Sequence, residues 1–264
     1  MISKEYGRFS TYKQVPDHPV GYIFVVPGFA ESLQQTKPIV EALAVKNLAA
    51  YTYSQPRLRN KEDGVLVHPL ERQGKVALMA LNELLPGHSK VTAVAHSLGT
   101  ATILKAVQLN PERFDTLILM QPVGLAGQQS FIDLFMRGLR KNRNNYSSVK
   151  DTSSLHDHKT VAKAQFGSVI TIAKQPLLAI REATAIGSYS TSKDVKSVIS
   201  SGIKVHLVIS KFDEYFDYSN MQTQLEDLGN VATSITILDE PHHGHDINWL
   251  DPALTADLTI KLLA

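Results

Sequence analysis

Short continuous apolar runs alternate with longer amphipathic stretches along most of the chain. The apolar runs are partly β-branched and bounded by turn residues, which is typical of strands buried on both faces of a sheet. We place these strands at residues 21–26, 49–53, 91–95, 114–120, 203–210 and 232–238. Apolar residues at helical spacing predict helices at residues 37–46, 68–85, 99–108, 217–228 and 251–263. This order favours an α/β fold with a mostly parallel open sheet and helices on both faces.

Three local features refine this pattern. Residues 6–12 alternate between apolar and polar side chains and predict an antiparallel edge strand. In the helix at 37–46, Pro38 would lie in the first turn, where its missing N–H is tolerated. His206 lies inside the strand at 203–210, so we interpret it as a structural histidine.

The alternation of strands and helices stops between residues 121 and 201, an interval too long for one crossover connection. Within it, helical or apolar stretches occur at residues 130–139, 161–173 and 177–186. We therefore expect two parts, an α/β core formed by residues 1–120 and 202–264 and an inserted helical cap at residues 121–201.

A serine lies on the tight turn after the strand at 91–95. The segment reads Ala95-His96-Ser97-Leu98-Gly99, a strand-to-helix nucleophile elbow G-x-S-x-G with alanine at the first glycine position. Small residues are needed at both places because the strained backbone brings strand and helix close together. The motif predicts that Ser97 exposes its hydroxyl above the end of the sheet. In an ordinary turn, the same serine would cap the helix.

The loop after the strand at 21–26 is a source of backbone hydrogen-bond donors near this serine. It reads Pro27-Gly28-Phe29-Ala30-Glu31-Ser32, and Gly28 lets the backbone bend sharply. The N–H of Phe29, or of Ala30 beside it, would form an oxyanion hole with the N–H of Leu98. A plain strand-to-helix loop is the alternative interpretation.

Carboxylates and histidines follow the last two strands. Asp213 and Glu214 come directly after the strand at 203–210, at the edge where open α/β sheets place their sites. After the strand at 232–238 comes Pro241-His242-His243-Gly244-His245-Asp246, from which a histidine could reach both Ser97 and Asp213.

The same loop could instead hold a metal ion, since three histidines and an aspartate lie close together. His243 and His245 are only two positions apart, and no histidine-rich or acidic helix elsewhere supplies further ligands. We therefore expect neither a metal nor a cofactor, and zinc binding is the alternative for this loop.

With serine, acid and histidine in this chain order, the sequence resembles the α/β-hydrolase superfamily over essentially its whole length, including a helical cap insertion. The resemblance implies that Ser97 is the nucleophile, Asp213 orients the imidazole and His245 is the general base. It also implies an oxyanion hole from the backbone N–H groups of Phe29 and Leu98.

The family pattern also ranks the competing residues. Gly244-His245-Asp246 resembles the Gly-His-acidic turn that often carries the family's histidine, so His245 is preferred and His243 is the fallback. Asp213 is preferred over Glu214 and Asp217 because it comes third after the strand, where the family's acid usually lies. The sequence departs from the family at Ala95, usually glycine, and at Pro27, where a histidine is common.

In a protein of this kind, the cap covers the serine, excludes water and shapes the acyl pocket. Phe131, Phe135 and Phe166 are candidates for lining that pocket. Packing of the cap on itself is the alternative role for each of them.

Composition narrows the class of protein. A hydrophobic content of 43% and a charged content of 20% are those of a soluble globular protein, and a net charge of +2 favours no charged partner such as nucleic acid. The chain has no cysteine, which excludes disulfides and thiolate nucleophiles. It has no apolar signal core and no run long enough to span a membrane, so we expect a cytoplasmic monomer or homodimer.

These features together predict a serine hydrolase that cleaves a carboxylic ester or thioester of a small, mostly apolar substrate through an acyl-enzyme. An acyltransferase of the same fold and a non-catalytic small-molecule receptor are the alternatives. The sequence leaves open the acyl length, the leaving group and the choice among ester, thioester and lactone.

Overall fold

A seven-stranded sheet in the order β1-β3-β2-β4-β5-β6-β7 forms the centre of the computed structural model. The structure describes residues 9–54, 68–87, 90–127 and 176–264, together with residues 129, 130, 133 and 137. The strands are β1 (Thr11–Gln14), β2 (Tyr22–Val26), β3 (Ala49–Tyr53), β4 (Val91–His96), β5 (Phe114–Met120), β6 (Lys204–Ser210) and β7 (Ser234–Leu238). All neighbours pair in parallel except β1, which is antiparallel to β3. The mostly parallel open sheet with an antiparallel edge strand is thus confirmed, but the edge strand lies at Thr11–Gln14 rather than at residues 6–12.

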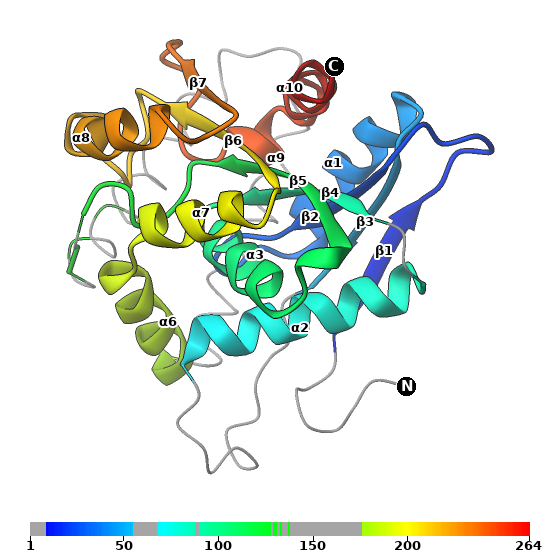
Figure 1. The fold of residues 1–264 in the computed structure, drawn as a ribbon, viewed down its shortest axis with the longest axis horizontal. Coiled ribbons are helices and arrows are strands. Elements are labelled where there is room, and N and C mark those ends of the chain that lie inside the picture. The colour runs from blue at the N-terminus through cyan, green and yellow to red at the C-terminus, as the bar shows by residue number, and fades with distance from the viewer. Residues whose placement is uncertain are drawn as a thin grey trace.

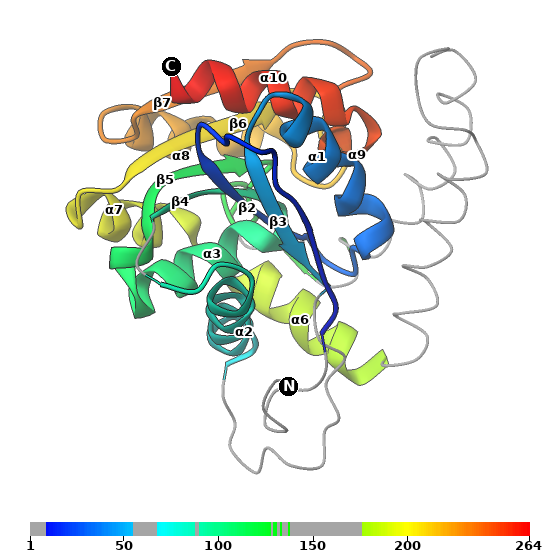
Figure 2. The same cartoon turned by 90° about the vertical axis from the view of Figure 1, so that its right-hand side faces the viewer.

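Helices cover both faces of this sheet (Figures 1 and 2). On one face lie α1 (Leu33–Val45), α9 (Ile247–Leu250) and α10 (Pro252–Leu263), and on the other α2 (Pro69–Leu84), α3 (Leu98–Leu109), α7 (Thr191–Ser200) and α8 (Tyr218–Gly229). A 3-10 turn, η1 (Pro111–Arg113), precedes β5, and α6 (Pro176–Ser188) contacts α2. None of the described helices combines the length and apolar character that crossing a membrane requires.

Strands β2 to β6 read as continuous apolar runs because each faces two cores. In β2, Phe24 and Val26 join the core beneath α2 and α3, whereas Ile23 and Val25 join the core beneath α1 and α10. All four side chains are at most 3% exposed. A strand buried on both faces has no polar face to interrupt the run, which is why the sequence located these strands within one or two residues.

The first helix begins earlier than predicted. α1 starts at Leu33 rather than at residue 37, because Ser32 is its N-cap and the Ser32 N–H donates to Gln35 Oε1 at 2.8 Å. Pro38 therefore lies inside the helix rather than in its first turn. The position of the N-cap residue Ser32 therefore sets the start of the helix, and the position of Pro38 does not.

His206 occupies the structural position that we expected of it. Its Nδ1 lies 2.8 Å from the Oγ of Ser234, the residue opposite it on β7. Burial and the neighbouring charge of Lys204 lower the pKa of His206. The side chain thus joins two strands and lies away from their C-terminal ends.

The interval expected to form the cap is described only in part. Its last portion contains α6 and α7, and α7 packs against α3 and β6. Phe131, Phe135 and Phe166 lie outside the described residues. The division into a core of residues 1–120 and 202–264 and a cap of residues 121–201 therefore stays a prediction.

The close packing of α2 on α3 gives a stability prediction for Gly74→Ala. A Cβ at Gly74 would lie 2.8 Å from Lys105 Cβ and 2.9 Å from Ala106 N. In a solvent-exposed helix, Gly→Ala raises the free energy of unfolding by about 1 kcal/mol. Here we expect the free energy of unfolding to fall by about 1–3 kcal/mol, because the added methyl group forces α2 away from α3. Denaturant unfolding measures it.

Gly229→Ala in α8 is the matched control, because its Cβ would meet only Ile235 Cδ1, at 3.9 Å. We expect this variant to be at least as stable as the wild type. A Gly74→Ala protein with unchanged or increased stability would contradict the close approach of α2 and α3.

Candidate active site

Ser97 lies on a strained turn between β4 and α3, and the residue is 7% exposed, so it is more buried than the motif predicted. Its backbone has φ 51° and ψ −121°, a conformation that residues with a Cβ rarely adopt. The turn is held because the Ser97 N–H donates to Met120 O on β5 at 3.0 Å, and the Ser97 carbonyl accepts from Thr100 N at 3.0 Å. Among the described residues, no hydrogen bond engages Ser97 Oγ, and such bonds are often long before a substrate binds.

The turn depends on the absence of a side chain at Gly99. A Cβ there would lie 2.5 Å from Val26 O and 2.7 Å from Pro27 O, far inside contact distance. The start of α3 therefore packs directly on the backbone at the end of β2, which brings the serine turn against the loop at residues 27–32. This approach is the physical reason for the small residue that the motif required.

The loop after β2 differs in one respect from the prediction. The residue with positive φ is Ala30, at 55°, and Gly28 does not adopt such a conformation. Gly28 is small for another reason, since its Cβ would lie 3.0 Å from His96 Nδ1 and 3.1 Å from Glu31 Oε1. Among the described residues, the backbone N–H groups of Phe29 and Leu98 make no hydrogen bond.

The structure brings Asp213 and His245 together. Asp213 Oδ2 lies 2.7 Å from His245 Nδ1, and both side chains are at most 6% exposed. The other oxygen of Asp213, Oδ1, accepts from the N–H groups of Tyr215 at 2.8 Å and Phe216 at 2.9 Å. Both oxygens of the carboxylate are therefore hydrogen-bonded, and the contact with Nδ1 orients the His245 ring.

The competing residues make other contacts. Glu214 Oε2 accepts from the backbone N–H of His245 at 2.8 Å, and Asp217 Oδ1 accepts from Ser219 N at 3.0 Å as the cap of α8. His243 is 9% exposed, and its Nδ1 has no hydrogen-bond partner among the described residues. Of the two histidines, only His245 therefore contacts the carboxylate of Asp213.

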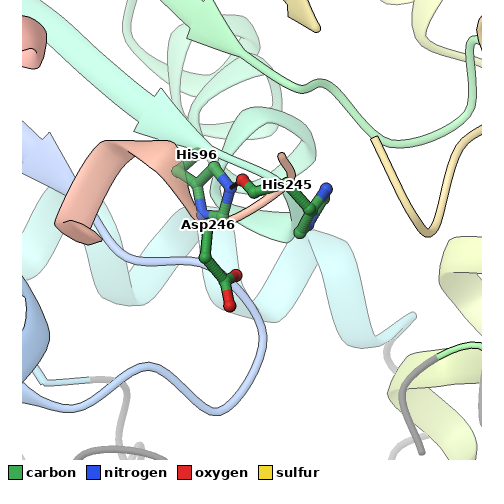
Figure 3. Close-up of side chains that lie close together, drawn as sticks. All are labelled: His96, His245 and Asp246. Atoms are coloured by element: carbon green, nitrogen blue, oxygen red, sulfur yellow. Dashed lines mark hydrogen bonds between the residues drawn. The ribbon is translucent and has the colours of Figure 1, made fainter. Parts of the chain in front are cut away.

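A second buried pair, Glu31 and His96, was not singled out from the sequence. His96 Nδ1 lies 2.6 Å from Glu31 Oε1, and His96 Nε2 lies 2.8 Å from the carbonyl oxygen of His245. Figure 3 shows His96, His245 and Asp246 and marks the bond from the His96 ring to the His245 backbone. The available signal was a histidine inside the elbow motif, next to Ser97, combined with an acid in the loop after β2.

Two groups of side chains have donor atoms close enough to share a metal ion. In the first, His96, His245 and Asp246, both His96 ring nitrogens and Nδ1 of His245 already make hydrogen bonds. The second, Glu240, His242 and His243, contains two exposed members. Within the described part of the chain, each group provides three ligands, one fewer than a closed structural zinc site uses.

Comparisons with known proteins identify the fold. No family model matches the sequence, and no curated protein is similar to it in sequence. Many solved structures are similar in shape. An enol-lactonase from Burkholderia xenovorans is 12% identical, with a TM-score of 0.65 over 97% of this chain and 96% of that chain. A bromoperoxidase from Bacillus anthracis is 13% identical, with a TM-score of 0.67 over 97% of this chain and 94% of the bromoperoxidase chain.

The carboxylesterase CesB from Bacillus subtilis is similar in the same way, with 13% identity and a TM-score of 0.62 over 100% of this chain and 90% of that chain. At such low identities, the likeness shows a shared fold. It extends over nearly the full length of each chain.

The contact beneath Gly99 gives a prediction for Gly99→Ala. The added methyl group would meet two backbone carbonyl oxygens, which cannot rotate away as a side chain could. We expect the free energy of unfolding to fall by about 1–3 kcal/mol, measured by denaturant unfolding. Wild-type stability in this variant would contradict the close approach of α3 to the end of β2.

Proposed function

We propose that this chain, which has the α/β-hydrolase fold, is a serine hydrolase that cleaves a carboxylic ester or thioester of a small, mostly apolar substrate. The observation that carries the proposal is the 2.7 Å contact between His245 Nδ1 and Asp213 Oδ2. It lies at the same edge of the sheet as Ser97, whose positive φ is typical of the nucleophile on an elbow turn.

In the proposed reaction, Ser97 Oγ attacks the acyl carbon while His245 Nε2 removes its proton. Asp213 accepts a hydrogen bond from Nδ1–H of His245, which leaves the lone pair on Nε2 and stabilises the imidazolium that forms. His245 then returns the proton to the leaving group. Water attacks the acyl-enzyme in the second half of the cycle, with His245 again as the base.

The negative charge of the tetrahedral intermediate would be bound by two backbone N–H groups, those of Phe29 and Leu98. Neither is engaged within the described part of the chain, and Leu98 is the first residue of α3, whose N-terminal dipole favours an anion. One such donor typically contributes about 3–4 kcal/mol to lowering the barrier.

The choice of substrate class rests on the nucleophile and on the similar structures. A serine nucleophile forms an acyl-enzyme with esters and thioesters. The similar structures include an enol-lactonase and a carboxylesterase, which supports the ester class without specifying the substrate of this chain. The proposed cap at residues 121–201 would shape the acyl pocket and determine the acyl length.

The proposal predicts opposite results for two neighbouring histidines. His245→Ala removes the base, so kcat for a small aryl ester should fall on the order of a millionfold. His243→Ala removes a ring that makes no contact with Asp213, and we expect it to retain most of the wild-type kcat. Both are assayed below the melting temperature of the less stable variant. Loss of turnover in His243→Ala alone would overturn the assignment of His245.

A further inference from the structure

Glu31 and His96 form a charged or proton-sharing pair that the proposed reaction does not use. The side chains are 6% and 5% exposed, and the two atoms in contact, Glu31 Oε1 and His96 Nδ1, lie 2.6 Å apart. Burying two such groups is unfavourable unless they are paired and hydrogen-bonded. Because His96 is next to Ser97 in the chain and its ring contacts the His245 backbone, the pair's contacts with the neighbouring loops matter.

The pair touches each of three loops that carry the proposed catalytic groups. Glu31 Oε2 accepts from the N–H of Gly28, one residue before Phe29 in the loop after β2. His96 directly precedes Ser97 in the chain. The ring of His96 reaches the carbonyl oxygen of His245, 2.8 Å from Nε2. A movement of either side chain would therefore change the relative positions of three groups. These are the Phe29 N–H of the oxyanion hole, the nucleophile Ser97 and the base His245.

We propose that Glu31 and His96 are positioning residues, which hold these three loops in register through one proton shared between His96 Nδ1 and Glu31 Oε1. This inference rests on the proposed function and deepens it, because it explains how residues far apart in sequence keep the geometry that ester cleavage needs. A misplacement of about 1 Å between reacting groups can reduce turnover about a hundredfold.

The number of protons on the pair follows from its partners. The carbonyl oxygen of His245 can only accept, so His96 Nε2 carries a hydrogen. Glu31 Oε2 accepts from Gly28 N, so one further proton lies between His96 Nδ1 and Glu31 Oε1. Removing that proton at high pH leaves two acceptors facing each other. A second proton at low pH would place two donors there.

The surroundings favour the protonated form of His96. Burial alone lowers the pKa of His96, but the charge and hydrogen bond of Glu31, the charge of Asp246 and the carbonyl of His245 together raise the pKa above its ordinary value. The titratable groups that face the pair are Asp246 and the ring of His245, whose centroid is 4.8 Å from that of His96.

The direction of the pH effect follows from this shift. A histidine with a raised pKa in the folded state stabilises the fold fully below its unfolded pKa, about 6.5. That stabilisation is lost as the pH rises through the folded value. The melting temperature and kcat should therefore both decrease as the pH rises through the folded pKa of His96, because both depend on the same proton.

Glu31→Gln is the informative substitution because an amide can keep every hydrogen bond without the shared proton. Its oxygen can accept from Gly28 N, and its NH2 can donate to a neutral His96 Nδ1. The second amide hydrogen can reach Asn248, whose Oδ1 is buried without a partner among the described residues and whose Nδ2 lies 3.4 Å from Glu31 Oε1. A half-turn of the Asn248 amide exchanges these two atoms.

The experiment compares wild type, Glu31→Gln and Glu31→Ala, measuring kcat and KM for an aryl ester and the melting temperature over the same pH series. We expect Glu31→Ala to lose about a hundredfold in kcat with a smaller change in KM. We expect Glu31→Gln to recover most of the wild-type kcat and to lack the alkaline decrease in melting temperature that the wild type shows.

Three results would overturn the inference: an unchanged kcat in Glu31→Ala, an equal loss in both variants, or the same alkaline decrease in melting temperature in Glu31→Gln and wild type. A folded wild type without ester turnover would instead overturn the proposed function. In that event, the melting profiles of wild type and Glu31→Gln still decide whether the pair shares a proton, because they need no catalysis.

Discussion

Parallel pairing of six strands, β2 to β7, is the constraint on which the candidate site depends. Because β2, β4, β5, β6 and β7 run in the same direction, the loops that follow them leave the sheet at one edge. Phe29, Ser97, Asp213 and His245 lie in four of these loops or at their ends. Strand direction thus gathers residues from most of the chain at one place, before any side chain contributes.

The backbone of the loops after β2 and β4 is strained, and the surrounding sheet keeps it in this conformation. Ser97 and Ala30 have positive φ values of 51° and 55°, and Gly99 packs on the carbonyl oxygens at the end of β2. Such conformations cost roughly 1–3 kcal/mol each and persist only where the surroundings fix them. Here the surroundings are strands buried on both faces and the buried contact of Glu31 with His96.

The sequence predicted what depends on the hydrophobic pattern and on a local motif, and missed a helix-capping bond and a contact between residues far apart in the chain. Strands buried on both faces read as apolar runs, so the sheet was predictable, whereas the start of α1 depended on a capping bond of Ser32. The elbow at Ser97 is a local motif, but Asp213 and His245 were chosen by a resemblance in chain order. The pair of Glu31 and His96 joins positions 65 residues apart, and no periodicity reports such a contact.

Covalent labelling by a fluorophosphonate, measured by intact mass, tests the central claim most directly, because the probe reacts with a serine only where a base and an oxyanion hole activate it. We expect one phosphonate adduct on the wild type and none on Ser97→Ala, with both proteins folded. A folded wild type that gains no adduct, or a Ser97→Ala variant that is labelled equally, would contradict it.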